Sequence, residues 1–327
     1  MDSHSEQKSH TNYPLMFSDL NNLGRLYISG KDPLDLLNRL TTNDLSDFDN
    51  FSSVSTVMTN GDAKVIDYLT LAAGEESGVW CVTSEGRSSA VSNWLDMYTF
   101  GEDITVTECT QSTGHIIILS SWSDQFKVME NAGFKIPQIA QSSSNNPYNA
   151  IVFPSSFGRY KALQILIPKR EDLSHLKALL YEACINELTE DEFEELRIFE
   201  GVPMYSKEFG EFNNPLEARL TGVISETKGC YTGQEVIARL QTYQKIQRQL
   251  MSFDSSEIIE VGSSLFTKEG TGVGTVTSAY VNGKATRGLA LVSTKYATNS
   301  QVLTSKDEAQ SITLTHPFHA IATEPVN

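Results

Sequence analysis

The sequence predicts an α+β fold followed by a smaller, all-β C-terminal domain. Up to residue 245, apolar runs of strand length alternate with amphipathic helical stretches, the pattern of an α+β region. From residue 246 onward, short apolar runs alternate with glycines and no helical stretch interrupts them. A chain of 327 residues also exceeds what one compact core usually holds. We therefore predict an α+β region over 1–245 and an antiparallel barrel or sandwich over 246–327.

The first predicted elements are a helix and a β-hairpin. Asp32 precedes Pro33 and a row of leucines, which favours a helix start with Asp32 as its cap. The run VSTVMT at 54–59 leads through an Asn-Gly-Asp turn at 60–62 into AKVIDYLTLA at 63–72. Since an Asn-Gly step between apolar runs is a strong hairpin signal, we expect two paired strands here.

Helical spacing predicts three further helices in the middle of the chain. Helix 86–99 is expected to turn inward the side chains of Ala90, Trp94 and either Met97 or Tyr98. Helix 171–187 places Cys184 on its apolar stripe. Thr189 and Glu192 match a capping box for the next helix. The other elements predicted before residue 246 are strands at 78–83, 103–108, 115–120, 150–153 and 162–167, and a short helix at 123–131.

Charge and composition exclude several function classes. The formal net charge of −16 disfavours binding to nucleic-acid backbones and to anionic membrane surfaces, which need basic patches. No apolar run reaches the roughly 20 residues that span a bilayer. The N-terminal residues are polar, which predicts a frayed tail and a cytoplasmic protein. The four cysteines form no C-x-x-C pair and the histidines are scattered, so we predict no metal site.

The glycine-rich run GTGVG at 270–274 contains a G-x-G-x-G pattern. A dinucleotide site needs a helix directly after such glycines, so that the phosphates meet helix N–H groups. The residues that follow, TVTSAYV, favour a strand. We therefore interpret these glycines as a bend in a strand.

The most informative block is residues 197–240. Arg197 and Glu200 lie near the end of a helix, where they are either a solvated charged pair or part of a site. Further on, Cys230 stands between two glycines, two residues after Lys228. A nearby cation and a helix that opens at Thr232 or Gly233 would favour a reactive thiolate. From the chemistry alone, a functional thiol and a small buried cysteine both remain open.

This block also carries a family resemblance. KGCYTGQE at 228–235 resembles the K-G-C-[YF]-x-G-Q-E pattern of the YgfZ-type folate-binding proteins. The segments 30–45 and 57–71 are similar to that family's N-terminal helix and hairpin. RIFEGVP and NPLEA are similar to a stretch shared with the aminomethyltransferases of glycine cleavage. The matches run in order over residues 27–253.

The resemblance implies a cloverleaf of two related, interleaved α+β units around a central channel, with a C-terminal β-barrel. It implies tetrahydrofolate, or another folate derivative, in that channel. Glu200 would pair with the pterin, because a carboxylate accepts an amino group and a ring N–H together. Arg197 or Arg239 would pair with the glutamate tail of the folate. The remaining motif positions expected to contact the cofactor are Lys228, Tyr231 and Gln234.

The resemblance leads to a functional hypothesis with alternatives. We expect a folate-dependent accessory protein for the synthesis or repair of iron–sulfur clusters, with Cys230 as its reactive group and iron–sulfur proteins as clients. The glycine-cleavage enzymes carry an Asp-Asp pair where this chain has Asp67-Tyr68. Asp67 is therefore a second candidate for chemistry, in an aminomethyltransferase or demethylase. A pure folate-binding module without thiol chemistry is the third possibility.

Overall fold

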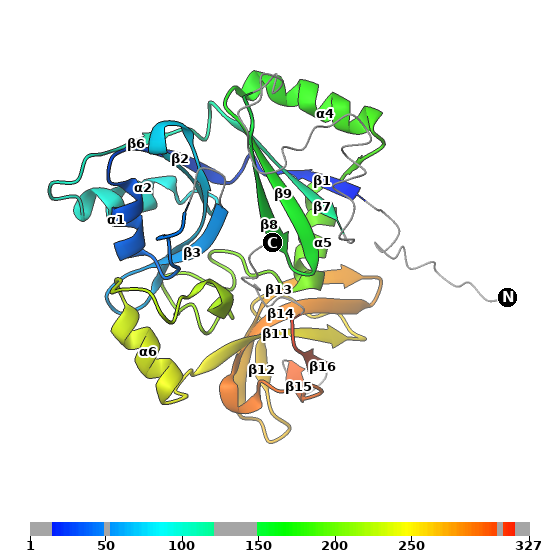
Figure 1. Cartoon of the computed structure of the whole chain (residues 1–327). Helices are drawn as coiled ribbons and strands as arrows, with labels where there is room; N and C mark the ends of the chain where they lie inside the picture. The colour runs from blue at the N-terminus through cyan, green and yellow to red at the C-terminus, as the bar shows by residue number, and fades with distance from the viewer. Residues whose placement is uncertain (1–14, 49–52, 121–148, 306–309, 318–327) are drawn as a thin grey trace.

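The first sheet forms from a segment near the N-terminus. Its strand order is β3-β4-β5-β2-β6, and every neighbouring pair is antiparallel. Helices α1 (Pro33–Leu40) and α2 (Ser88–Met97) bury leucines, Val91 and other apolar side chains against it. The strands are β2 (Gly24–Gly30), β3 (Ser53–Thr59), β4 (Val65–Ala73), β5 (Val79–Thr83) and β6 (Ile104–Glu108). This unit is the blue and cyan lobe of Figure 1.

The second sheet shows that the two α+β units are interleaved. Its order is β10-β1-β7-β9-β8, so the chain begins in this sheet, crosses to the first sheet and then returns. Its helices are α4 (Leu173–Glu182) and α5 (Glu190–Glu200). Its strands are β1 (Leu15–Asp19), β7 (Gly114–Ser120), β8 (Ile151–Phe157), β9 (Tyr160–Ile167) and the two-residue β10 (Asn186–Glu187).

The two sheets meet along β3 and β8. The Ser53 hydroxyl on β3 donates a hydrogen bond of 2.6 Å to the carbonyl of Pro154 on β8. Beside this contact, Ala72 and Val82 of the first sheet form one buried cluster with Phe153 and Leu166 of the second. The junction is therefore a packed seam that holds the two units together.

The C-terminal domain is a closed six-stranded barrel of order β11-β14-β13-β12-β15-β16. Ile198 of α5 packs against leucines of β11 and β14, which fixes the barrel to the second unit. Its strands are β11 (Arg248–Ser255), β12 (Ser264–Phe266), β13 (Gly272–Asn282), β14 (Ala285–Ser293), β15 (Val302–Ser305) and β16 (Gln310–Thr315). The predicted fold class, α+β with a C-terminal antiparallel barrel, is confirmed, and Gly272 and Gly274 lie in a strand as expected. Figure 1 shows the barrel in yellow to red below the other two lobes.

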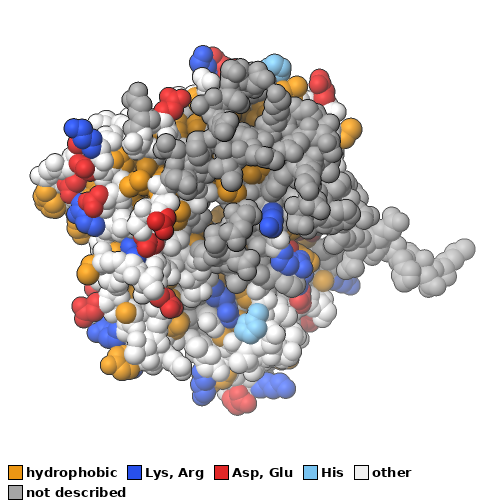
Figure 2. Space-filling model, viewed as in Figure 1, with side chains coloured by type: hydrophobic (Ala, Val, Ile, Leu, Met, Phe, Trp, Pro, Cys, Tyr) orange, Lys and Arg blue, Asp and Glu red, His pale blue; other side chains and the backbone are white. Residues whose placement is uncertain are grey.

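This computed structural model describes residues 15–48, 53–120, 149–305 and 310–317. The N-terminal tail, the helix predicted over 123–131 and the polar loop at 141–147 lie outside the described residues. No described helix is long and apolar enough to cross a membrane. Within the same ranges, no group of three or more His, Cys, Asp or Glu residues could hold a metal ion. On the face shown in Figure 2, acidic and basic side chains are intermixed.

Three local predictions need correction. Asp32 does not cap its own helix, because its carboxylate accepts a hydrogen bond of 2.7 Å from the backbone N–H of Asp103. Helix α2 buries Val91 and Leu95 most deeply, one position beyond Ala90 and Trp94. The predicted Trp94 and Tyr98 pack against the same core, whereas Met97 is 60% exposed. Helix α4 ends at Glu182, so Cys184 lies beyond it, exposed and with a left-handed backbone.

Candidate functional site

A cavity of about 1540 Å³ lies where the two sheets meet α5 and the loop 202–209. Typical small-molecule sites have volumes of roughly 300–1,000 Å³. The cavity is therefore large enough for an elongated ligand. Figure 1 shows these elements around the centre of the molecule.

Aromatic side chains form two parts of the cavity wall. The ring of Phe209 lies 6.3 Å from that of Tyr68 and 5.8 Å from that of Tyr205, centroid to centroid. Across the second unit, the rings of Phe157 and Phe193 are 4.9 Å apart. Burial raises the pKa of Tyr68 to about 12. Flat aromatic faces of this kind suit a planar ligand ring.

Charged groups of both signs line the rest of the cavity. Lys177 contacts Asp19 at 2.9 Å and Glu187 at 2.7 Å, so its charge is balanced inside the protein. Among the described lining residues, the carboxylates are Asp19, Glu85, Glu187, Glu190, Glu192 and Glu194, and the cations are Arg170, Lys177, Arg197 and Lys207. Acids outnumber bases, which favours ligands that present hydrogen-bond donors.

Asp67 lies immediately beneath the cavity wall. Its side chain is completely buried and accepts hydrogen bonds from the backbone N–H groups of Tyr68 and Ser84, each at 2.9 Å. Burial raises its pKa to about 6, and these hydrogen bonds oppose the rise. Tyr68 and Ser84 line the cavity, whereas Asp67 is not among the described lining residues. The Asp67 carboxylate is therefore separated from the described cavity by Tyr68 and Ser84.

Glu200 is also completely buried, and its carboxylate is bonded to Arg159. It accepts hydrogen bonds of 2.8 Å from the backbone N–H and from the guanidinium of Arg159, at the turn between β8 and β9. Gly158 in this turn has φ +59°, and a Cβ there would lie 2.4 Å from the Cβ of Glu200. Glu200 is not one of the described residues lining the cavity. In this structure the Glu200 carboxylate holds a turn, and its pairing with a pterin stays a prediction.

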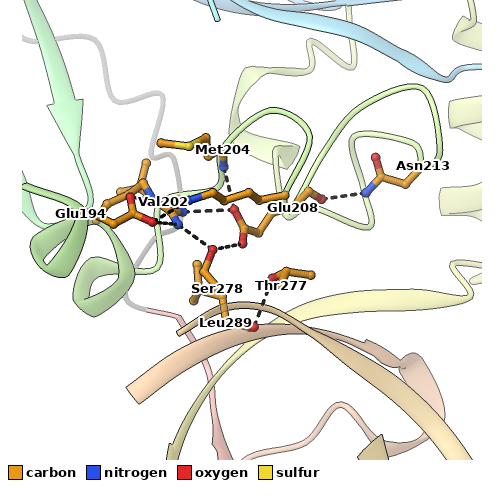
Figure 3. Close-up of polar contacts among 10 residues, drawn as sticks. Glu194, Val202, Met204, Glu208, Asn213, Thr277, Ser278 and Leu289 are labelled. Atoms are coloured by element: carbon orange, nitrogen blue, oxygen red, sulfur yellow. Dashed lines mark hydrogen bonds and ion pairs between the residues drawn. The ribbon is translucent and has the colours of Figure 1, made fainter. Parts of the chain in front are cut away.

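Arg197 lies at the cavity but is bonded entirely within the protein. It is 2% exposed, and its five N–H donors contact the carboxylate of Glu194, the carbonyl of Val202, Glu208 and the hydroxyl of Ser278. Figure 3 shows these groups converging from α5, the following loop and β13. Since every donor is used, Arg197 joins the barrel to the second unit and has no donor left for a folate tail.

Lys228 holds the end of a helix. Its ammonium donates to the backbone carbonyls of Asn38, at 2.7 Å, of Thr41, at 2.9 Å, and of Asn43. These carbonyls end α1, where a cation is favoured by the helix dipole. Burial lowers the pKa of Lys228 to about 8, and the nearby charge of Asp44 opposes this. The ammonium thus ties the motif to α1, and the contact of Lys228 with the cofactor stays a prediction.

The rest of the motif presents Cys230 outward. Gly229 and Cys230 are exposed, while Tyr231 is 8% exposed and packs in an apolar cluster. Burial raises the pKa of Tyr231 to about 12. Gly233 has φ +85°, and a Cβ there would lie 2.7 Å from the carbonyl of Asn60, so only glycine fits against the β3–β4 turn. The thiol is accessible, and Cys230 is not among the described residues at the cavity.

Helix α6 (Gln234–Thr242) begins directly after the motif, close to the predicted start. Gln234 is its first residue and is partly buried, whereas Arg239 in its last turn is exposed. Neither belongs to the described cavity lining. The structure therefore does not bring the motif residues together with Asp67, Glu200 or Arg197 in one site.

Several polar residues of the cavity wall belong to no motif in the sequence. Ser55 and Thr70 lie on the first sheet, and Ser155 and Gln164 lie on the second. Gln164 could have been noticed in the sequence, because it is a polar residue inside the apolar run ALQILI. The serines and the threonine could not, since such residues are common on half-buried strands.

Two relatives found by sequence comparison are similar over most of this chain. One is a protein of Arabidopsis thaliana whose name marks it as a candidate chloroplastic transferase. It is 28% identical over 308 residues, which is 92% of this chain and 71% of the relative. Another is an aminomethyltransferase of Chlorobium chlorochromatii, 21% identical over 80% of this chain and 73% of the relative.

Structure and family comparisons agree on the fold. The glycine cleavage system aminomethyltransferase T from Bartonella henselae superposes with a TM-score of 0.76. The match covers 95% of this chain and 88% of that protein. Because the sequence identity is only 16%, the match shows a shared fold and no more. Residues 3–228 match the family described as the GCVT N-terminal domain. Because that match spans more than half of the chain, this protein belongs to the GCVT N-terminal domain family.

Proposed function

We propose that the chain binds tetrahydrofolate, or a related reduced folate, in the central cavity and serves iron–sulfur proteins through Cys230. The cavity between the two sheets is the observation that carries the folate part. It lies in a chain whose relatives include proteins named aminomethyltransferases, and its aromatic and acidic lining fits a reduced pterin.

The cavity residues fit this cofactor chemically. A pterin has a flat ring with an amino group and a ring N–H on one edge, which suits aromatic faces and carboxylate acceptors. Tyr68, Tyr205 and Phe209 supply the faces. For the anionic glutamate tail, Arg170 and Lys207 are the candidates, because both are exposed cations on the cavity lining. They replace Arg197 and Arg239 in this role.

The iron–sulfur part of the proposal is supported by the exposure of Cys230. The motif is anchored on both sides by Lys228 and Tyr231, and only Gly229 and Cys230 between them are exposed. One thiolate is too few ligands for a resident cluster, which usually has four. We therefore propose that Cys230 makes a transient contact with the iron or sulfur of a client protein. The iron or sulfur is then a substrate of this protein and not a resident cofactor.

Calorimetric titration with tetrahydrofolate tests the folate part. Wild type is expected to bind, and Tyr205→Ala to bind about 5- to 150-fold more weakly, since aromatic stacking on a planar base contributes about 1–3 kcal/mol. Tyr243→Ala is the matched control, because Tyr243 is 64% exposed and lies beyond α6. Absence of binding by the wild type would remove the folate proposal.

A complementation assay tests the thiol part. Cells that lack the chain receive wild type, Cys230→Ser or Cys184→Ser, and the activities of their iron–sulfur enzymes are measured. Both cysteines are exposed, so Cys184 controls for loss of any surface thiol. Cys230→Ser is expected to fail while retaining tetrahydrofolate affinity, and Cys184→Ser to succeed. Full complementation by Cys230→Ser would contradict the thiol role and would support a folate-binding module without thiol chemistry.

Asp67 favours a second candidate function, aminomethyl transfer to tetrahydrofolate. Its buried carboxyl, with a pKa raised to about 6, is poised near neutral pH beneath the cavity wall. The aminomethyltransferase relatives agree with this alternative. Turnover of an aminomethyl donor with tetrahydrofolate, lost in Asp67→Asn, would support it over the accessory role. The predicted cytoplasmic location stays a prediction.

A further inference from the structure

One hydroxyl at the cavity has no partner. The Oγ atom of Ser155 on β8 is buried and makes no hydrogen bond with any described residue, although Ser155 lines the cavity. A buried hydroxyl without a partner is costly, and most such groups in proteins are satisfied. An unpaired hydroxyl on a cavity wall therefore marks a position where a ligand atom supplies the missing bond.

Gln164 on β9 is the second polar group of this wall. It is 8% exposed, and its Oε1 atom lies 2.9 Å from the Nε2 atom of His115. Burial, helped by the charge of Arg25, lowers the pKa of His115 to about 3, so its ring is neutral. A neutral ring that faces an amide oxygen donates from Nε2, which leaves Nδ1 as a buried acceptor. His115 thereby fixes the amide, and the Nε2 donors of Gln164 remain for the cavity.

The two groups share one face of the sheet. Phe153 pairs with Gln164, and Ser155 pairs with Ala162, in the antiparallel ladder of β8 and β9. Ser155 and Gln164 are therefore diagonal neighbours, whose side chains project to the same side about 7–8 Å apart. Across the β3–β8 seam, Ser55 and Thr70 continue this polar strip on the cavity wall.

We infer that Gln164 and Ser155 form a donor pair that recognises the 4-oxo edge of the pterin, with His115 as a positioning residue. This inference rests on the proposed folate function. A 4-oxo oxygen has two lone pairs and accepts from an amide N–H and from a hydroxyl. A 4-amino group at the same position would bring N–H against the N–H groups of Gln164. The pair therefore selects oxo-pterins over amino-pterins.

The test is a ratio of two affinities, measured by calorimetry. The ligands are tetrahydrofolate and its 4-amino-4-deoxy analogue, in which the oxo group is replaced by an amino group. Wild type is expected to prefer tetrahydrofolate at least tenfold. Gln164→Glu is expected to reverse the preference, because a carboxylate accepts from the amino group and repels the oxo oxygen. Ser155→Ala is expected to lower the ratio several-fold.

Two further variants separate positioning from folding. His115→Leu frees the Gln164 amide to rotate, so the ratio is expected to fall toward one, a readout that a loss of stability alone does not move. Lys161→Ala, on the exposed side of the same hairpin, is expected to keep the wild-type ratio. An unchanged ratio in both Gln164→Glu and Ser155→Ala overturns this inference while folate binding stands. Failure of wild type to bind either ligand overturns the proposed function itself.

Discussion

The ammonium of Lys228 lies 2.9 Å from the backbone carbonyl of Thr41, although 187 residues separate them in the sequence. Two other carbonyls at the end of α1 accept from the same ammonium. The backbone N–H of Thr232 also donates to the carbonyl of Arg39. The motif around Cys230 therefore takes its position from the end of α1.

Replacing Lys228 by Met is expected to destabilise the protein by about 3 kcal/mol, because hydrogen bonds to a charged donor contribute roughly 1.5–3 kcal/mol and the carbonyls lose their partner. Urea unfolding measures the change. Lys284→Met, at an exposed turn of the barrel, is the control and should change stability little. Equal stability of the two variants would mean that water replaces the ammonium without cost.

Removing Arg197 is expected to loosen the barrel. Its buried guanidinium pairs with Glu208, which is fully buried, so Arg197→Met leaves an uncompensated carboxylate and should cost about 3–5 kcal/mol. Arg39→Met is the matched control, because Arg39 makes exposed ion pairs that contribute at most about 1 kcal/mol. Chemical unfolding of both variants checks this, and a similar loss in each would argue against the central role of Arg197.

Because of Asp67, the free energy of unfolding is expected to fall as the pH rises. Burial raises its folded-state pKa to about 6, above the unfolded value of 3.8, so the folded protein binds more protons between these values. Stability from this group is therefore lost as the pH rises from about 4 to 6, by about 3 kcal/mol at most. The difference between wild type and Asp67→Asn, from urea unfolding at several pH values, should follow this trend. Asp62→Asn, at an exposed residue, is the matched control.

Alanine substitutions at Gly158 and Gly86 distinguish the cost of a left-handed backbone from the cost of a steric clash, because the two glycines have similar φ angles. Gly158 and Gly86 have φ +59° and +69°, but only Gly158 faces a neighbour, the side chain of Glu200. Gly86→Ala is expected to cost about 1–2 kcal/mol from its left-handed backbone alone. Gly158→Ala should cost about 1–3 kcal/mol more, because the added methyl group forces Glu200 to move. Thermal unfolding of both variants tests this, and equal losses would show that the turn adapts.

Alkylation rates distinguish the four cysteines. Cys81 is completely buried and burial raises its pKa, so it is expected to be unreactive in the folded protein. Burial also raises the pKa of Cys109, which is partly exposed. Cys230 and Cys184 are both exposed, and we expect Cys230 to react faster because it lies just before the N-terminus of α6. Mass spectrometry after brief iodoacetamide treatment gives the order, and faster labelling of Cys184 would contradict it.

Much of the fold could be predicted because local chemistry dictates it. The Asn-Gly turn joins β3 to β4 as expected, and the Thr189–Glu192 capping box starts α5. The errors fall where tertiary contacts compete with local preference. Asp32 bonds to the distant Asp103 instead of its own helix, and α2 is rotated by one residue so that Val91 and Leu95 meet the sheet.

In the candidate site, too, local patterns could be predicted from the sequence and contacts between distant segments could not. Residue order alone indicated the relationship to the aminomethyltransferases of glycine cleavage and the C-terminal barrel, since these depend on patterns within one segment, whereas the assignment to the YgfZ-type proteins stays a prediction. Whether a charged side chain faces a ligand or a neighbour was decided only by the tertiary structure. Arg197, Glu200 and Lys228 each found a partner in another segment, because a buried charge must be compensated and its partner can lie anywhere along the chain.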